Sequence, residues 1–310
     1  MDDGIRAILE RQQYRIVGRH SAVKLCHWLG EKLLRNRACY KEKFYGIESH
    51  RCLQMSPAVN GCTQTCLFCW RYQGLQETAI PEEDCPEEIL AGALEGQRRL
   101  VTGYKGDPRT KPGMWAEAAE PNMVACSLSG EPTMYSRLGE FFAACHKRGM
   151  TTFLVTNGTL PEALERLDPL PTQLYVTVAA PNEEIYRKLC VPLRKDNWLR
   201  LNRTLELLPS LGTRTVIRHT LVEGWNMGHE REYARLAEKA DPLFIEPKGY
   251  VFVGYSRERM HADNMPSQER ILQFSEKLAS ETGRLVLAEQ RASRVALVGA
   301  DKTKMSIRGE

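Results

Sequence analysis

The sequence of 310 residues predicts an α/β fold with a mostly parallel sheet. From about residue 52, short apolar runs rich in β-branched residues alternate with longer segments of helical period, which is the pattern of successive β-α units. Proline or glycine stands at nearly every junction between these segments, as turns require. Six or seven units over roughly 230 residues are typical of one barrel or one doubly wound sheet.

The units can be placed along the chain in order. Strands are expected at residues 52–59, 123–130, 151–157, 173–180, 214–222 and 243–253, with a further candidate at 284–290. Helices are expected at 86–104, 136–149, 182–190, 197–212, 230–240 and 267–281. The first fifty residues do not follow the alternation, so we expect a helical extension over 1–51 and a β/α core over 52–310. In such cores the reactive groups lie on the loops after the carboxyl ends of the strands.

The composition excludes a membrane-spanning protein. Hydrophobic residues make up 42% of the chain and charged residues 26%, which is ordinary for a globular protein. No apolar run approaches the length of about 20 residues that crosses a bilayer. The first residues, MDDGIRAILE, include acidic side chains where a secretory signal would be basic. We therefore expect a cytoplasmic protein without a membrane partner. A monomer is expected as well, although nothing in the composition indicates the oligomeric state.

Ten cysteines in a reducing compartment are unlike a disulfide framework. The clustered ones are better explained as metal ligands or reactive thiols. The scattered ones are interpreted as plain buried residues; these are Cys85, Cys126, Cys145 and Cys190.

Basic residues are concentrated in two stretches, although the net charge is only +4. Either stretch can contact phosphates, and either can equally be a solvated surface. The first consists of Lys32, Arg35, Arg37, Lys41, Lys43 and Arg51, and the second of Arg98, Arg99, Lys105, Arg109 and Lys111.

The stretch CTQTCLFCW places Cys62, Cys66 and Cys69 on the loop after the first expected strand. Thiolates bind both zinc and iron-sulfur clusters. A structural zinc site needs a fourth ligand, for which His50 and Cys52 are the nearest candidates in sequence. A four-iron cluster held by three thiolates instead leaves one iron open to a substrate. The spacing alone leaves both interpretations open.

This cysteine loop resembles the C-x3-C-φ-C loop of radical S-adenosylmethionine (SAM) enzymes, with Phe68 as the aromatic residue. The resemblance implies a partial (β/α)6 TIM-like barrel and a 4Fe-4S cluster whose open iron chelates SAM. An electron from the cluster then cleaves the sulfonium to give a 5′-deoxyadenosyl radical. The sequence SLSGEPTMY after the next strand is similar to the family's GEP element, so Gly130, Glu131 and Pro132 are expected to hold the methionine group of SAM.

Further polar residues at strand ends are candidates for SAM contacts. Asn157 ends VTN and Arg218 lies in VIRHTL, although each also fits a strand-end turn or a surface pair. The family often has an acidic residue at the end of the fourth strand. Here that strand reads TVAAPN, so Thr177 and Asn182 are the only polar candidates there.

Upstream, Cys26, Cys39 and Cys52 are thirteen residues apart. Such wide spacing is by itself weak support for a metal and fits buried structural thiols. However, the run from AVKLCHW to TCLFCWR, together with SLSGEPT, FIEPKGYVFVGYS and SRVALV, is similar to the radical SAM family of tRNA 4-demethylwyosine synthases. The resemblance implies that these three cysteines bind a second 4Fe-4S cluster, again with one open iron.

The same resemblance implies the reaction and its partners. The family joins two carbons of pyruvate to N1-methylguanosine next to the anticodon of tRNA-Phe, as a carbon-carbon lyase of wybutosine biosynthesis. It uses a lysine as Schiff-base partner of pyruvate, which matches Lys41, with Lys43 as the rival amine. Glu246 and Lys248 are expected to line the cavity or to form an ordinary salt bridge. The short extension lacks a flavodoxin-like domain, so an external electron donor is implied.

Two other functions are compatible with parts of the pattern. A radical SAM enzyme for a small-molecule or protein substrate would keep the cysteine loop and need no tRNA. An iron-sulfur sensor or a zinc-bearing nucleic-acid-binding protein would bind no SAM.

Overall fold

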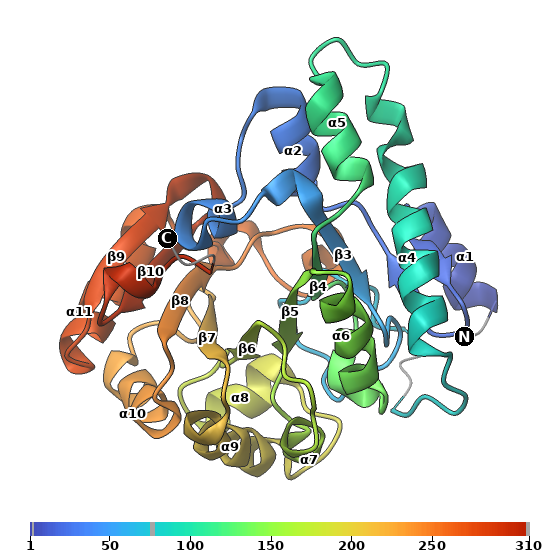
Figure 1. The fold of residues 1–310 in the computed structure, drawn as a ribbon. Coiled ribbons are helices and arrows are strands. Elements are labelled where there is room, and N and C mark those ends of the chain that lie inside the picture. Colours follow the sequence, from blue (N-terminus) through green and yellow to red (C-terminus); the bar gives the residue numbers. More distant parts are fainter. Residues whose placement is uncertain (2, 75–77, 308–310) are drawn as a thin grey trace. The chain divides into compact units, whose positions relative to one another are not determined.

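A computed structural model describes residues 1, 3–74 and 78–307. The chain forms two compact units, each built from more than one segment; Figure 1 shows the ribbon coloured along the sequence. The first unit comprises Met1–Cys62, Gly74–Val155 and Arg166–Gln173, and the second Thr63–Gln73, Thr156–Glu165 and Leu174–Glu310. The segment that carries Cys66 and Cys69 is therefore grouped with the C-terminal half of the chain.

The first unit contains a sheet in the order β1-β2-β3-β4-β5. β2 pairs antiparallel with β1 and β3, whereas β4 pairs in parallel with β3 and β5. Helices α4 and α6 pack against each other beside these strands (Figure 1). The elements are α1 (Asp3–Arg11), β1 (Arg15–Val17), β2 (Ser21–Val23), α2 (His27–Arg35), α3 (Tyr40–Tyr45), β3 (Cys52–Ser56), α4 (Pro86–Val101), α5 (Pro112–Ala119), β4 (Met123–Cys126), α6 (Leu138–Lys147) and β5 (Thr151–Thr156).

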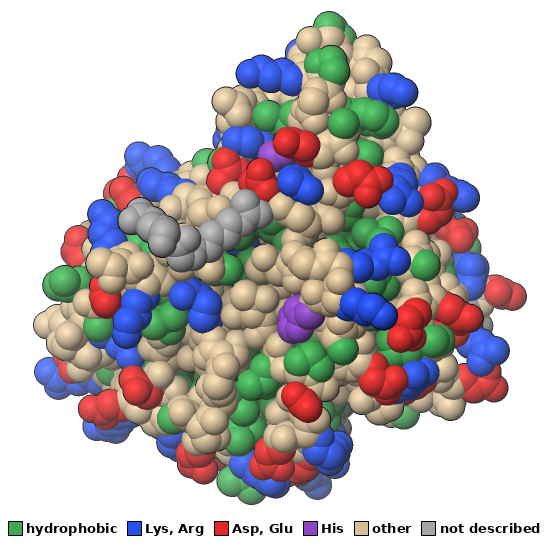
Figure 2. Space-filling model, viewed as in Figure 1, with side chains coloured by type: hydrophobic (Ala, Val, Ile, Leu, Met, Phe, Trp, Pro, Cys, Tyr) green, Lys and Arg blue, Asp and Glu red, His purple; other side chains and the backbone are tan. Residues whose placement is uncertain are grey.

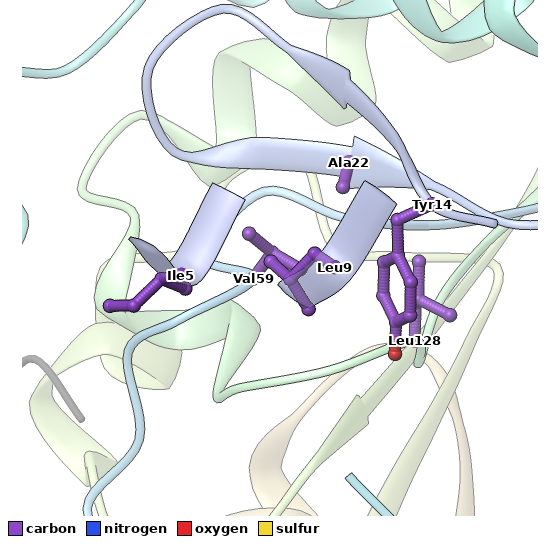
Figure 3. Close-up of a cluster of buried hydrophobic side chains, with 6 residues drawn as sticks. All are labelled: Ile5, Leu9, Tyr14, Ala22, Val59 and Leu128. Carbon is purple, nitrogen blue, oxygen red and sulfur yellow. The ribbon is translucent and has the colours of Figure 1, made fainter. Parts of the chain in front are cut away.

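The N-terminal helix α1 anchors two functional loops. Its apolar side faces the segments that follow β3 and β4, because a helix with one apolar face must bury it. Val59 precedes the cysteine loop and Leu128 precedes the GEP element. The buried cluster consists of Ile5, Leu9, Tyr14, Ala22, Val59 and Leu128 (Figure 3). The extension is therefore part of the core of its unit.

The second unit contains strands in the order β6-β7-β8-β10-β9. β7 and β8 are parallel, and β10 pairs antiparallel with both β8 and β9. Helix α11 packs on β8, β9 and β10. Helix α10 contacts both α9 and α11 (Figure 1). The elements are α7 (Pro161–Glu165), β6 (Gln173–Thr177), α8 (Glu183–Cys190), α9 (Asn197–Leu207), β7 (Arg214–Leu221), α10 (Glu230–Ala240), β8 (Phe244–Gly249), α11 (Gln268–Glu281), β9 (Leu285–Gln290) and β10 (Val295–Gly299).

The expected alternation is confirmed, with additions and shorter strands. Each expected strand is present as β3 to β9, and each expected helix is present. β8 ends at Gly249 instead of residue 253, and β4 ends at Cys126 instead of residue 130. The extension has the expected helices α1, α2 and α3, together with the unexpected hairpin β1–β2. Strand β10, a wholly buried apolar run, and the short helices α5 and α7 were also not predicted.

Within the described ranges, no helix has the length and apolarity needed to cross a lipid bilayer.

The buried histidine His219 predicts acid sensitivity. It lies on β7, its Nδ1 donates to Val178 O at 2.8 Å, and burial lowers its pKa to about 4. The unfolded chain binds that proton near pH 6.5, so folding stability is lost as pH falls from about 6.5 toward 4, by about 3 kcal/mol in all. We expect chemical denaturation to show lower stability at pH 5 than at pH 7.

The variant His219→Gln keeps an amide donor for Val178 O and removes the titrating group. Its stability should therefore depend less steeply on pH than that of the parent, whatever its absolute value. Equal slopes for the two proteins between pH 7 and pH 5 would contradict this explanation.

Candidate functional site

The loop that carries Cys66 and Cys69 is held through its main chain. Thr65 N donates to Val191 O at 3.0 Å, and Leu67 N donates to Leu189 O at 2.9 Å. These acceptors lie at the end of α8 and just beyond it. Main-chain partners fix the path of the loop while leaving its cysteine side chains available as ligands.

The two thiols on this loop share a low-polarity environment. A hydrogen bond with Cys190, burial and the charge of Cys190 raise the pKa of Cys66 well above its usual value. Burial and the neighbouring Cys66 raise the pKa of Cys69. A metal that binds thiolates must displace both protons. Cys190 is thus buried, as expected, but it also lies beside a candidate ligand.

The other scattered cysteines differ in burial. Cys126 and Cys145 are buried, as expected. Cys85 is only partly buried, and its Sγ donates to Glu87 Oε2 at 2.9 Å in the first turn of α4. The prediction of a buried Cys85 was therefore wrong, because this residue precedes a helix that begins at the surface.

The GEP element packs directly on the residues that precede Cys62. Gly130 has φ +68°, and a Cβ there would lie 1.8 Å from Ala58 O and 2.4 Å from Gly61 O. Only glycine can occupy this position. Glu131 N donates to Gly61 O at 2.6 Å, so two successive residues of the element contact the same short segment.

The rest of the element forms a tight turn. Glu131 is 1% exposed, and its carboxylate accepts hydrogen bonds from Thr133 N at 3.1 Å and Thr133 Oγ1 at 2.7 Å. Pro132 begins a short 3₁₀ helix, η3 (Pro132–Met134), where its missing N–H costs nothing. The element is therefore rigid on the side that faces the cysteine loop.

Asn157 contacts the start of the cysteine loop, and Phe68, a residue of the loop, packs on a hydrophobic cluster. Asn157 Nδ2 donates to Thr63 Oγ1 at 2.9 Å, and its Oδ1 accepts from Thr159 N at 3.0 Å. Phe68 is half-buried and packs on a hydrophobic cluster formed by Leu189, Val222, Tyr250 and Met260. Both side chains support the loop from within the second unit.

Arg218 forms an ion pair with Glu246. Its Nη2 lies 3.2 Å from Glu246 Oε2, and its guanidinium carbon lies 4.5 Å from the centre of the Tyr175 ring. Glu246 is fully buried. Removing Arg218 would therefore leave the buried carboxylate of Glu246 without a compensating charge. Glu246 was expected either to line the cavity or to form an ordinary salt bridge, and the structure contains a salt bridge, with Arg218 as the partner.

The remaining polar candidates differ in environment. Lys248 Nζ donates to Ser293 O at 2.6 Å. Thr177 is half-buried at the end of β6. Asn182 is the N-cap of α8, where its Oδ1 accepts from Ile185 N at 3.1 Å.

The three upstream cysteines converge in the first unit. Cys26 and Cys39 precede α2 and α3, and Cys52 begins β3. Burial raises the pKa of Cys52 to about 12, with Cys26 and Cys39 acting in the same direction and Lys41 in the opposite one. The thiol of Cys52 is thus within electrostatic reach of Cys26, Cys39 and the Lys41 amine.

Lys41 and Lys43 lie in different environments. Lys41 is 9% exposed, and its Nζ lies 4.3 Å from the centre of the Phe153 ring on β5. Lys43 is exposed on the same short helix. The neighbouring Glu42 accepts hydrogen bonds from Lys32 Nζ and Ser49 Oγ at 2.7 Å and 2.6 Å, which fixes the helix in place.

The donor set fits an iron-sulfur cluster better than zinc. His50 Nε2 donates to Glu117 Oε2 at 2.7 Å, and Cys52 lies with Cys26 and Cys39, so neither is placed as a fourth ligand of the cysteine loop. Among the described residues, no group of three or more His, Cys, Asp or Glu side chains is placed to hold a metal ion. Thiolates are the ligands of iron-sulfur clusters, and the three cysteines of the loop would supply three of them.

The basic stretches carry less unpaired charge than the sequence implies. Arg98 pairs with Glu120, and Arg109 pairs with Asp107. Arg35, the last residue of α2, and Arg37, which lies just beyond it, both pair with Glu31. Acidic and basic side chains are interspersed on the face shown in Figure 2. The pair of Arg98 and Glu120 is exposed and contributes little to stability.

Comparisons with known proteins agree over the whole chain. The description "Radical SAM superfamily" matches residues 56–237, and "Wyosine base formation" matches residues 239–299. S-adenosyl-L-methionine-dependent tRNA 4-demethylwyosine synthase of Pyrococcus abyssi is 48% identical, over 97% of this chain and 90% of its own. The protein of the same name from Methanocaldococcus jannaschii is 40% identical, over 97% of both chains.

One solved structure is similar throughout. It is described as "Structure of TYW1 with a lysine-pyruvate adduct bound", and its TM-score is 0.89 at 39% identity over 96% of each chain. This likeness confirms the expected fold class, a partial β/α barrel.

Proposed function

We propose that the chain, which belongs to the radical SAM superfamily and to the family of tRNA 4-demethylwyosine synthases, condenses pyruvate with N1-methylguanosine of tRNA-Phe. Family membership implies SAM and a 4Fe-4S cluster as cofactors. The observation that carries the finer proposal is the convergence of Cys26, Cys39 and Cys52 with Lys41. A site for cleaving SAM alone would not require it.

Each group of residues has a proposed role. Cys62, Cys66 and Cys69 hold the cluster that, when bound, supplies the electron for cleavage of SAM. Gly130, Glu131 and Pro132 hold the methionine end of SAM, and the backbone contacts of Gly130 with Ala58 and Gly61 keep that element in place. The remaining proposed SAM contacts are Phe68, Asn157, Thr177 and Arg218.

Lys41 is the proposed amine for pyruvate. Its buried position beside the Cys26, Cys39 and Cys52 thiols supports this role over the exposed Lys43. A buried amine is less hydrated and a better nucleophile when neutral. Condensation of the amine with the ketone of pyruvate releases water and gives an imine. The lysine-pyruvate adduct named for the related structure supports the same chemistry here.

The second cluster completes the proposal. Three cysteines with no fourth protein ligand would leave one iron open, where the carboxylate of pyruvate can bind. Residues 1–51 are the proposed extension that carries most of these ligands, with Cys52 at the start of the core. Loss of the pyruvate carboxyl carbon would make the enzyme a carbon-carbon lyase. An external electron donor, a monomeric state and a cytoplasmic location belong to the same proposal.

Nucleoside mass analysis tests the function. Anaerobically reconstituted protein should convert methylated tRNA-Phe only when SAM, a reductant and pyruvate are all present. Cys66→Ala should abolish both SAM cleavage and base formation, because it removes a ligand of the SAM-binding cluster. A base formed without pyruvate, or SAM cleavage that persists in Cys66→Ala, would contradict the proposal.

A further inference from the structure

We propose that Arg259 is a positioning residue for the cysteine loop, a fixed cation that holds the turn from Cys66 to Cys69 and raises the reduction potential of its cluster. The inference rests on the proposed role of Cys62, Cys66 and Cys69 and goes beyond it. Arg259 lies in the region that matches wyosine base formation, not in the region that matches the radical SAM superfamily.

The geometry of Arg259 is that of a two-point clamp. Its Nε donates to Leu67 O at 3.3 Å and its Nη2 donates to Cys69 O at 2.6 Å. Cys69 N in turn donates to Cys66 O at 3.1 Å, which closes the turn between the two cysteines. A planar guanidinium can contact two carbonyls at once, whereas an ammonium cannot reproduce that fork.

The segment before Arg259 also follows the cysteine loop. Tyr255 N donates to Trp70 O at 3.1 Å. Gly254 has φ +57°, and a Cβ there would lie 2.4 Å from Trp70 O. This segment forms the 3₁₀ helix η5 (Gly254–Glu258), and its buried Ser256 accepts a hydrogen bond from Arg259 N at 3.0 Å. Arg259 is therefore carried by backbone that is itself fitted to the loop.

The charge of Arg259 lies at the turn between the two cysteines, because its guanidinium contacts Leu67 O and Cys69 O. An arginine stays charged at any working pH, so it offers permanent stabilisation to negative charge on the loop.

The same charge bears on electron transfer. Reduction adds one negative charge to a cluster, and a nearby fixed cation stabilises the reduced state more than the oxidised state. Arg259 should therefore make the cluster easier to reduce. A residue of the reaction-specific region would thus set a property of the shared radical chemistry, in the same unit of the fold as the loop.

The test compares Arg259→Gln and Arg259→Lys with Arg257→Gln. Arg257 is exposed two residues away, and its guanidinium carbon lies 5.5 Å from the centre of the Phe252 ring instead of at the loop carbonyls. Each reconstituted protein is titrated with reductant while the electron paramagnetic resonance signal that responds to SAM is followed. Because only the cluster on the cysteine loop is proposed to bind SAM, this signal reports on that cluster and not on the second one.

We expect Arg259→Gln to shift the midpoint potential to more negative values, and Arg259→Lys and Arg257→Gln to stay near the parent. Equal potentials for Arg259→Gln and Arg257→Gln would overturn the proposal, as would an Arg259→Lys shift as large as that of Arg259→Gln. If Arg259→Gln assembles no cluster while Arg259→Lys and Arg257→Gln do, the loss supports the same role for the charge at position 259, whereas failure of Arg257→Gln as well would overturn it. A parent protein without any SAM-responsive signal would instead refute the cluster assignment itself.

Discussion

Replacing Lys41 by alanine is expected to reduce formation of the modified base by on the order of 100-fold or more, the scale seen when a reacting side chain is removed. The amine is buried and within electrostatic reach of the Cys52 thiol, and alanine has no group that can take its place. SAM cleavage should persist, because the loop of Cys66 and Cys69 is held by other residues. Nucleoside mass analysis and the yield of 5′-deoxyadenosine measure the two outcomes separately.

Lys43→Ala is the matched control, since Lys43 lies on the same helix α3 and is exposed. Borohydride reduction with labelled pyruvate should label the parent and Lys43→Ala, but not Lys41→Ala. Label that survives in Lys41→Ala and disappears in Lys43→Ala would transfer the role to Lys43.

Gly130→Ala is expected to destabilise the protein by about 3 kcal/mol or more and to weaken SAM binding at least tenfold. The added Cβ meets the main-chain oxygens of Ala58 and Gly61, which cannot rotate away as a side chain can. The segment before Cys62 must then shift. Thermal unfolding, iron content after reconstitution and SAM affinity report the effect.

Gly149→Ala separates the clash from backbone strain. Gly149 has the same φ of +68°, but a Cβ there would meet nothing within 4 Å. Its replacement should cost about 1–2 kcal/mol, the penalty of a left-handed residue alone, with SAM binding unchanged. If both variants lose the same stability and both bind SAM normally, the close contact at Gly130 has no functional role.

The periodic elements and the cysteine loop were predictable because their signals are local. Strands β3 to β8 are short apolar runs with turn residues at each end, and Gly130 is recognisable from its neighbours Glu131 and Pro132. The hairpin β1–β2 was missed because strands of three residues give too few alternations to detect. β10 was missed because it follows β9 after only a short turn.

Residues whose role depends on distant partners could not be predicted. Arg259 contacts a loop about 190 positions earlier in the chain, and Cys190 lies beside Cys66. Nothing in RERM or RKLC indicates those contacts. The same holds for Glu246, whose pairing with Arg218 follows from the adjacency of β7 and β8.

The packing of α1 also determines where the chain tolerates shortening. Ile5 and Leu9 cover Val59 and Leu128, which introduce the cysteine loop and the GEP element (Figure 3). Deleting the first eleven residues would expose this apolar patch to water, at a cost of roughly 25 cal/mol per Å² uncovered. The amino terminus is therefore a poor position for truncation, although α1 itself carries no proposed ligand.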